Sequence, residues 1–203
     1  MRIFLTGASS GVGHRLFTQL TESGNHVVAP TRAQLDLSVT DQVINYELDN
    51  VDMLINCAGT GVGGKIDFCN HRPTNVVEIL NTNLIGPVLL CQKVLSKNSH
   101  CKIVNITSTN NNRFWPGDLA YSLSKQSLSD LGSMLRVEYP SLRYLEVRLG
   151  LTKTNFNNNR YANDSERFQD VYGSHVYQTV ESAVDQITKV LFNDNIKFIE
   201  VAP

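Results

Sequence analysis

A short apolar run that ends in a glycine-rich turn places the strongest constraint on how this chain can fold. Residues 2–6 read Arg-Ile-Phe-Leu-Thr, and they lead into Gly7-Ala-Ser-Ser-Gly11-Val-Gly13 and then into residues with helical spacing. Glycines let a backbone turn tightly and approach a pyrophosphate, and the N–H groups at a helix N-terminus attract its negative charge. The pattern predicts a phosphate-binding loop between a first strand and a first helix. A turn that only packs the helix against the strand is the alternative.

The remainder of the chain alternates short runs of Val, Ile and Leu with segments of helical period. This order predicts an α/β fold, a doubly wound parallel sheet of the Rossmann type with helices on both faces in three layers. We expect strands at residues 2–6, 26–30, 52–56, 102–107, 143–148 and 197–201, and helices at 13–23, 40–48, 74–96, 121–139 and 180–192. With 203 residues, a single domain over 1–203 is expected.

Two segments depart from this regular pattern. Only about four residues separate the second strand from Leu35-Asp36-Leu37, whereas a parallel crossover needs about a dozen. Either the third strand of the usual sheet is vestigial, or residues 35–37 are extended without a helix of their own. Residues 154–173 are polar and rich in Asn, which predicts a loop with at most a short helix, and 154–178 is expected to be the substrate loop.

Composition and charge exclude several classes of function. The net charge is -1 and no block of Lys or Arg occurs, so neither nucleic acid nor a membrane surface is an expected partner. The apolar run at the N-terminus is too short for a signal peptide or a membrane span. The four cysteines and five histidines lack the spacing of zinc ligands, so we expect reduced thiols, no metal site and a cytoplasmic location.

A second group of residues predicts acid/base chemistry. Ser108 follows the fourth predicted strand, and thirteen residues later Tyr121 opens the run Tyr121-Ser-Leu-Ser-Lys125. A Tyr and a Lys four apart share one face of a helix. Carbonyl reduction needs a proton donor at oxygen, and a neighbouring ammonium lowers the pKa of a tyrosine from its usual value of about 10. Alternatively, these are a surface Ser, a half-buried Tyr and a solvated Lys.

Together these motifs resemble those of the short-chain dehydrogenases/reductases. The turn matches the T-G-x-x-x-G-x-G form, and Ser108, Tyr121 and Lys125 match the Ser, Tyr and Lys of that family. Asn56-Cys-Ala-Gly59 is similar to the family's N-N-A-G, with Cys in place of the second Asn, and Asn83 is similar to the asparagine of its catalytic tetrad. The resemblance implies an oxidoreductase that transfers a hydride between a nicotinamide cofactor and a carbonyl or secondary alcohol.

The resemblance also implies a role for each catalytic residue. Ser108 would orient the substrate oxygen, and Tyr121 would give or take the proton. Lys125 would lower the pKa of the tyrosine and hold the nicotinamide ribose. Asn83 would kink its helix and hold a water that links Lys125 to solvent.

Cofactor contacts follow from the same resemblance. Thr31 stands where NAD-dependent enzymes usually carry an acidic residue, and Arg32 can pair with a 2′-phosphate, so NADP(H) is favoured over NAD(H). Asp36-Leu37 resembles the pair that contacts the adenine, and residues 149–154 resemble the family's P-G-x-V-x-T, with Leu149 in place of Pro. The implied cofactor residues are Gly7, Ser9, Ser10, Gly11, Val12, Gly13, Thr31, Arg32, Asp36, Leu37, Asn56, Ala58, Gly59, Tyr121, Lys125, Gly150, Thr152 and Thr154.

The substrate is the least constrained part of the prediction. The pocket is expected beyond the carboxyl ends of the strands, at residues 59–73, 110–117 and the segment after 154. These segments hold Lys65, His71, Arg72, Arg113, Trp115, Arg160 and Tyr161, which favour a polar, anionic substrate such as a keto-sugar derivative unless they are only solvated loop side chains. The resemblance implies a homodimer or homotetramer. The alternative function is a non-catalytic dinucleotide-binding sensor or scaffold.

Overall fold

The structure is a computed structural model, and it describes residues 1–111, 115–160 and 176–203. Six parallel strands form one sheet in the order β2-β1-β3-β4-β5-β6. This order reverses direction between β1 and β3, the arrangement of a doubly wound sheet. The strands are β1 (Arg2–Leu5), β2 (His26–Val28), β3 (Met53–Asn56), β4 (Lys102–Ser108), β5 (Tyr144–Leu149) and β6 (Phe198–Val201).

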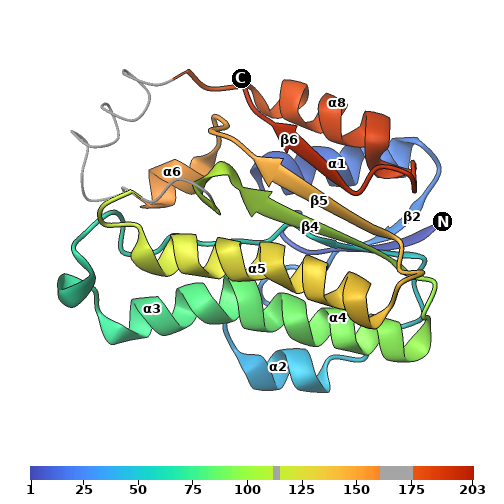
Figure 1. Cartoon of the computed structure of the whole chain (residues 1–203), viewed down its shortest axis with the longest axis horizontal. Helices are drawn as coiled ribbons and strands as arrows, with labels where there is room; N and C mark the ends of the chain where they lie inside the picture. The colour runs from blue at the N-terminus through green and yellow to red at the C-terminus, as the bar shows by residue number, and fades with distance from the viewer. Residues whose placement is uncertain (112–114, 161–175) are drawn as a thin grey trace.

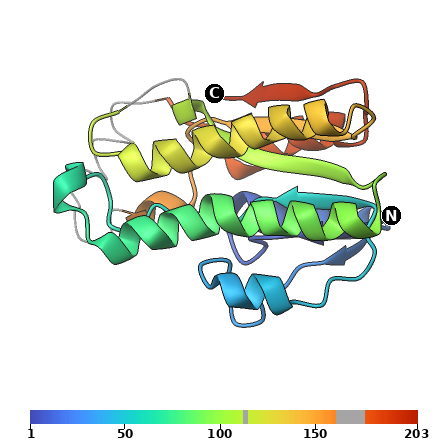
Figure 2. The ribbon, with the colours of Figure 1, turned by 60° about the horizontal axis from the view of Figure 1, so that its bottom comes forward.

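Helices cover both faces of the sheet (Figure 1). One face packs against α1 (Gly11–Glu22) and α8 (Val180–Leu191), whose apolar residues recur at helical spacing and are buried. The other face packs against α2 (Thr40–Asn45), α4 (Gly86–Lys97) and α5 (Leu119–Glu138). Figure 2 shows α4 and α5 side by side on this second face. The predicted α/β/α fold is confirmed.

The short connection after β2 contains no strand of its own. Residues 31–39 form turns and irregular backbone, so β2 is the edge of the six-stranded sheet. Leu35 and Leu37 are nonetheless buried, in the same apolar cluster as Phe4 and Leu90. The Asn81 side chain donates to the Ser38 carbonyl at 2.9 Å, which fixes the segment to the neighbouring helix. Of the two alternatives, the structure has the irregular stretch without a helix.

The helix predicted over 74–96 is divided into three parts. These are α3 (Pro73–Leu80), a π-helical turn (Asn81–Ile85) and α4. Among the described residues, 73–97 is the one stretch that is long and apolar enough to cross a membrane by composition. Here its buried residues Leu90, Cys91 and Val94 belong to the apolar cluster on the sheet. A core helix of an α/β protein can be as apolar as a membrane-spanning helix, because one of its faces is buried against the sheet.

Other boundaries shift by a few residues. The strand predicted to reach residue 30 ends at Val28, and the helix predicted over 40–48 ends at Asn45. Helix α5 begins at Leu119, two residues before Tyr121, and Asp118 occupies its N-cap position. In the predicted loop 154–173, residues Asn155–Arg160 form the short helix α6, and 161–173 lies outside the described residues. Single 3₁₀ turns occur at Phe68–Asn70 and Thr109–Asn111.

Candidate active site

A cavity of about 790 Å³ lies at the carboxyl ends of the strands. Parallel sheets of this topology bind ligands at that edge, next to the point where the strand order reverses. Most residues predicted for the site line the cavity: Gly7, Ser9, Ser10, Gly11, Val12, Gly13, Arg32, Asp36, Leu37, Ala58, Gly59, Ser108, Tyr121, Lys125, Gly150, Thr152 and Thr154. Segments far apart in the sequence therefore converge on one space.

The glycine-rich turn has a backbone that only glycine accommodates. Gly7 adopts a φ of +79°, and a Cβ at Gly13 would lie 2.1 Å from the Gly7 carbonyl oxygen. The turn therefore folds tightly against the start of α1, whose N-terminal N–H groups adjoin the cavity. A pyrophosphate fits such a cradle, so the residues present suit a dinucleotide cofactor.

Thr6, at the end of β1, connects the glycine-rich turn to the segment after β3. Its Oγ1 accepts hydrogen bonds from the backbone N–H groups of Cys57 and Ala58, both at 3.1 Å. Burial raises the pKa of the Cys57 thiol to about 11, so the thiol in this wall of the cavity is neutral. Thr6 is the threonine of the T-G motif, and its role here is to hold two cavity segments together.

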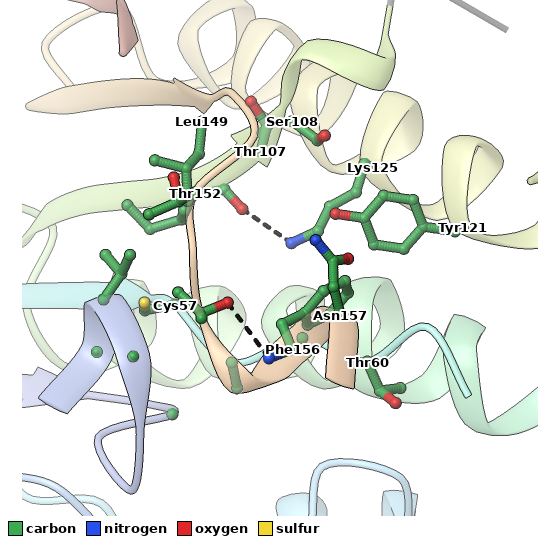
Figure 3. A pocket seen from close by; sticks show the side chains of 18 of the residues that line it. Cys57, Thr60, Thr107, Ser108, Tyr121, Lys125, Leu149, Thr152, Phe156 and Asn157 are labelled. Carbon is green, nitrogen blue, oxygen red and sulfur yellow. Dashed lines mark hydrogen bonds between the residues drawn. The ribbon is translucent and has the colours of Figure 1, made fainter. Parts of the chain in front are cut away.

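Ser108, Tyr121 and Lys125 lie together at one end of the cavity (Figure 3). Ser108 is the last residue of β4, while Tyr121 and Lys125 project from α5 one turn apart. The Tyr121 ring packs against Phe156 of α6, with 5.7 Å between ring centroids. In Figure 3 the Tyr121 hydroxyl, the Lys125 side chain and the Asn157 amide point into the same space. Three of the four side chains predicted to be catalytic therefore line the same end of the cavity.

Lys125 is a buried cation, with only 4% of its surface exposed. Its Nζ donates to the Ile106 carbonyl oxygen at 2.9 Å. Loss of hydration lowers the pKa of the Lys125 ammonium from 10.5 to about 8. At neutral pH the group is therefore charged, in surroundings that screen its field poorly.

Asn83 lies in the π-helical turn and is fully buried. Its Oδ1 accepts from the Thr60 N–H at 2.8 Å, and its Nδ2 donates to the Thr60 carbonyl at 2.9 Å and to Ser124 Oγ at 3.0 Å. Ser124 in turn donates to the Tyr121 carbonyl at 2.7 Å. Asn83 therefore connects the loop after β3 to helix α5, and π-turns often occur at functional sites. The water relay implied by the resemblance stays a prediction.

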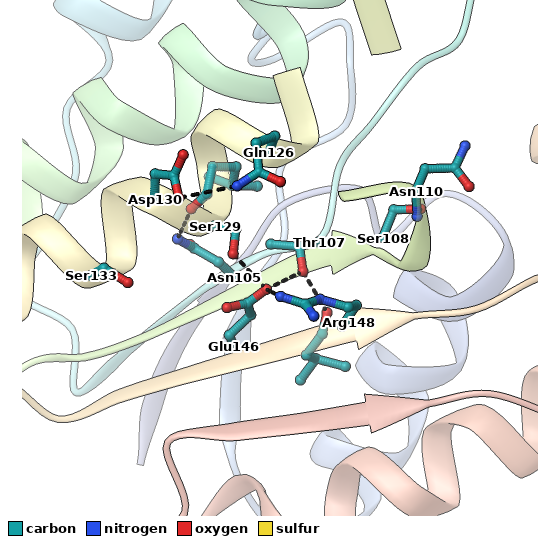
Figure 4. A network of polar contacts seen from close by, with 12 residues as sticks. Asn105, Thr107, Ser108, Asn110, Gln126, Ser129, Asp130, Ser133, Glu146 and Arg148 are labelled. Carbon is teal, nitrogen blue, oxygen red and sulfur yellow. Dashed lines mark hydrogen bonds and ion pairs between the residues drawn. The ribbon is translucent and has the colours of Figure 1, made fainter. Parts of the chain in front are cut away.

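A buried polar network supports β4 behind Ser108 (Figure 4). Glu146 of β5 accepts from Thr107 Oγ1 and from Ser129 Oγ, both at 2.8 Å, and pairs with Arg148 at 3.3 Å. These bonds join β4, β5 and α5 on the interior side. They hold the strand that carries Ser108 in a fixed position relative to the helix that carries Tyr121.

The opposite end of the cavity holds an ion-pair cluster around Arg32. Its Nε donates to Asp36 Oδ2 at 2.9 Å and its Nη2 to Glu78 Oε1 at 3.3 Å, while 68% of the side chain is exposed. Asp36 also accepts from the N–H and the hydroxyl of Ser38. These hydrogen bonds lower the pKa of the Asp36 carboxyl against the opposing effect of burial. Arg32 is thus oriented toward the cavity edge by two carboxylates.

Three predicted site residues do not line the cavity. Thr31 bonds to Gln34 in a turn, the Asn56 amide donates to Asn105 inside the core at 2.9 Å, and Asn83 is enclosed as described. Of the predicted pocket side chains, Lys65, Trp115 and Arg160 line the cavity, whereas His71 and Arg72 do not. Arg113 and Tyr161 fall outside the described residues.

Sequence reasoning did not single out several polar residues of the site, and Asp118 and Asn157 are two of them. Asp118 and Asn157 both line the cavity and are buried. Asp118 could have been noticed as a helix-capping residue next to Tyr121, but Asn157 lies in a polar segment without a distinguishing pattern. Within the described part of the chain, no group of three or more His, Cys, Asp or Glu side chains could hold a metal ion.

The chain is similar in sequence to proteins of known family. Residues 38–165 match the short chain dehydrogenase family. The chain is 31% identical over 180 residues to the 3-ketodihydrosphingosine reductase of Bacteroides thetaiotaomicron, covering 78% of this chain and 66% of that protein. It is 27% identical to an NADP-dependent 3-hydroxy acid dehydrogenase of Schizosaccharomyces pombe, covering 91% of this chain and 84% of the relative.

Solved structures show the same fold at lower identity. A serine dehydrogenase complexed with NADP+ superposes with a TM-score of 0.84 at 20% identity, covering 100% of this chain and 95% of the other. A 4-hydroxyisoleucine dehydrogenase complexed with NADH gives a TM-score of 0.81 at 21% identity, covering 99% and 97%. The family match and the sequence relatives go further than fold: the chain belongs to the short-chain dehydrogenase/reductase family and is an NAD(P)-dependent oxidoreductase.

Proposed function

We propose that this protein interconverts a small polar carbonyl compound and its alcohol with NADP(H), using Tyr121 as the proton donor and acceptor. The convergence of Ser108, Tyr121 and Lys125 at one end of a cavity that has the glycine-rich turn along its wall carries this proposal. The bound nicotinamide would supply or accept the hydride. The protein would supply the proton and hold the substrate oxygen.

Ser108 and Tyr121 would act on the same substrate oxygen. The Asn110 N–H donates to Ser108 Oγ at 3.2 Å, which favours the serine hydroxyl as a donor toward the substrate. In reduction, Tyr121 gives its phenolic proton to the oxygen that becomes the alcohol, and in oxidation it takes that proton back. The nearby Lys125 ammonium stabilises the phenolate that is left, because opposite charges attract strongly in a dry site.

Arg32 supports a preference for NADP(H). A guanidinium can pair with the two carboxylates that now orient it and still offer donors to a phosphate, because it carries five N–H groups. Ser9 and Ser10 line the same cavity and add neutral donors. We therefore propose that the 2′-phosphate of NADP(H) is recognised at this end of the cavity.

The side chains around Tyr121 favour a polar substrate. Lys65, Asn157 and Arg160 line the cavity together with Asn110 and Asp118. Two of the similar proteins are named for small polar compounds, a 3-hydroxy acid and serine, while the Bacteroides relative is named for a sphingoid ketone. The charged lining supports the first kind of substrate over a long apolar one.

We also propose that the protein forms a homodimer or homotetramer through α5. Four exposed apolar residues lie along one face of that helix, Leu119, Leu123, Met134 and Val137, with exposed fractions between 49% and 82%. Their spacing places them on a single stripe. A stripe of this kind on a soluble protein is typical of an interaction surface.

A Tyr121→Phe variant tests the proposed chemistry. It should bind NADPH with unchanged affinity and lose turnover of a carbonyl panel by about a thousandfold or more, because general acid/base catalysis contributes about 10² to 10⁴. The matched control is Tyr46→Phe, since Tyr46 packs on Phe4 away from the cavity. Near-normal turnover by Tyr121→Phe would overturn the mechanism.

A further inference from the structure

One wall of the cavity is built around a buried carboxylate. The side chain of Asp118 has no exposed surface, and it forms an ion pair with Arg160 of α6. Its Oδ2 also accepts from Asn110 Nδ2 at 3.2 Å and lies 3.7 Å from Lys65 Nζ. Asp118 is the N-cap residue of α5, so this cluster sits directly before the helical turn that carries Tyr121.

The Arg160 guanidinium is held in place from several sides. Only 6% of its side chain is exposed, and its Cζ lies 4.8 Å from the centroid of the Tyr121 ring. A Cβ at Gly61 would come within 3.1 Å of Arg160 Cδ, so a glycine there makes room for the arginine. A long, flexible side chain is thus fixed between Asp118 and the catalytic tyrosine, at the edge of the cavity it lines.

Positive charge gathers at this end of the cavity. Among the described lining residues, Lys65, Lys125 and Arg160 lie around Tyr121, and Asp118 is the carboxylate that faces them. Of the other acidic lining residues, Asp36 pairs with Arg32 at the opposite end, and Glu200 stands on β6. A guanidinium carries five N–H donors, so an anion bound in the cavity beside Tyr121 would be stabilised by charge-assisted hydrogen bonds.

We propose that Arg160, oriented by Asp118, binds a carboxylate of the substrate, and that Lys65 strengthens this contact. The planar guanidinium can engage carboxylates on two edges, Asp118 on one and the substrate on the other. Because Arg160 stacks on the Tyr121 ring, the carboxylate would lie close to the carbon that reacts. The substrate class is therefore a short hydroxy acid and its oxo acid. This assignment rests on the proposed function of the same site.

Matched acid and amide substrates test the assignment. The probes are 2-, 3- and 4-hydroxybutanoate and the corresponding neutral amides, oxidised with NADP+. The wild-type enzyme should have a higher kcat/KM for at least one acid than for its amide. Arg160→Gln should reduce kcat/KM for that acid by about 10² to 10³, mainly through KM, and this loss should exceed the loss for the amide by at least about tenfold. Lys65→Gln should show the same selectivity with a smaller loss.

Controls separate substrate binding from structural support. Arg136→Gln is the matched variant, because Arg136 lies on α5 away from the cavity and donates to the Gly132 carbonyl. Thermal unfolding and NADPH titration of Arg160→Gln show whether the fold and the cofactor site are intact. An equal loss for acid and amide would mean that Arg160 only supports Tyr121 and would overturn the assignment.

Failure of the assignment and failure of the proposed function give different results. If the wild-type enzyme prefers no acid over its amide but reduces other carbonyls in a Tyr121-dependent manner, the carboxylate assignment is wrong and the oxidoreductase function holds. If no carbonyl or alcohol is turned over, the proposed function itself fails.

Discussion

Lys125 should lower the free energy of unfolding of the cofactor-free protein relative to an apolar residue of the same length. The variant Lys125→Met tests this expectation. A pKa lowered from 10.5 to about 8 means that keeping the buried ammonium charged below pH 8 costs about 3 kcal/mol. The substitution also removes the donor to the Ile106 carbonyl, a loss of about 1 to 2 kcal/mol. At pH 7 the cofactor-free variant should therefore be more stable than the wild type by about 1 to 2 kcal/mol.

The stability difference between Lys125→Met and the wild type should depend on pH. Between about pH 8 and pH 10.5 the unfolded chain holds the Lys125 proton while the folded chain has released it, so wild-type stability rises with pH in this window. The variant lacks that gain. Its advantage at pH 7 should shrink by about 2 to 3 kcal/mol by about pH 10, and its sign should reverse.

Urea unfolding of the cofactor-free proteins at the two pH values measures the difference directly. Comparing variant with wild type cancels the titration of the groups whose pKa Lys125 does not influence. Lys93→Met is the matched control, because Lys93 donates to the Ile44 carbonyl from the partly exposed side of α4. A stability difference for Lys125→Met that is the same at pH 7 and pH 10 would refute the claim that this lysine is held charged against an unfavourable burial. Turnover by the variant should be lost at both pH values.

Three further changes probe the cofactor end, the turn and the surface. Arg32→Ala should weaken NADPH binding by about tenfold to a hundredfold and leave NADH affinity nearly unchanged in fluorescence titrations, and equal weakening of both would refute a phosphate role. Gly13→Ala would place a Cβ 2.1 Å from the Gly7 carbonyl oxygen, so it should abolish cofactor binding and lower the melting temperature. An unchanged cofactor affinity would contradict the tight turn. Leu123→Asp should convert the proposed oligomer to monomer in light scattering, since Leu123 is 50% exposed on the α5 stripe, and an unchanged mass would exclude that interface.

The sheet and the Tyr121–Lys125 pair could be predicted because their signals are local. A buried parallel strand is a short apolar run, and a Tyr and a Lys four residues apart must share a helical face whatever surrounds them. The missing third strand was visible as a connection too short for a crossover. The irregular segment that stands in place of this strand could not be predicted. Its residues Leu35 and Leu37 are buried by packing against β1 and α4 without forming a ladder. Burial of an irregular segment depends on its tertiary neighbours, which no local pattern encodes.

The contacts of Asn56 and Asp118 likewise depend on tertiary neighbours that no local sequence pattern encodes. In the sequence Asn56 belongs to a motif that the resemblance links to the cofactor, yet its amide bonds to Asn105 in the core. Asp118 has no distinguishing pattern in the sequence beyond its position before a helix, yet its carboxylate contacts Arg160, Lys65 and Asn110 from three other segments. Tyr121 and Lys125, for which we propose the acid/base chemistry, are close in sequence because both lie on helix α5. The residues that would select the substrate come from separate loops, so their roles follow only from the contacts that the fold creates.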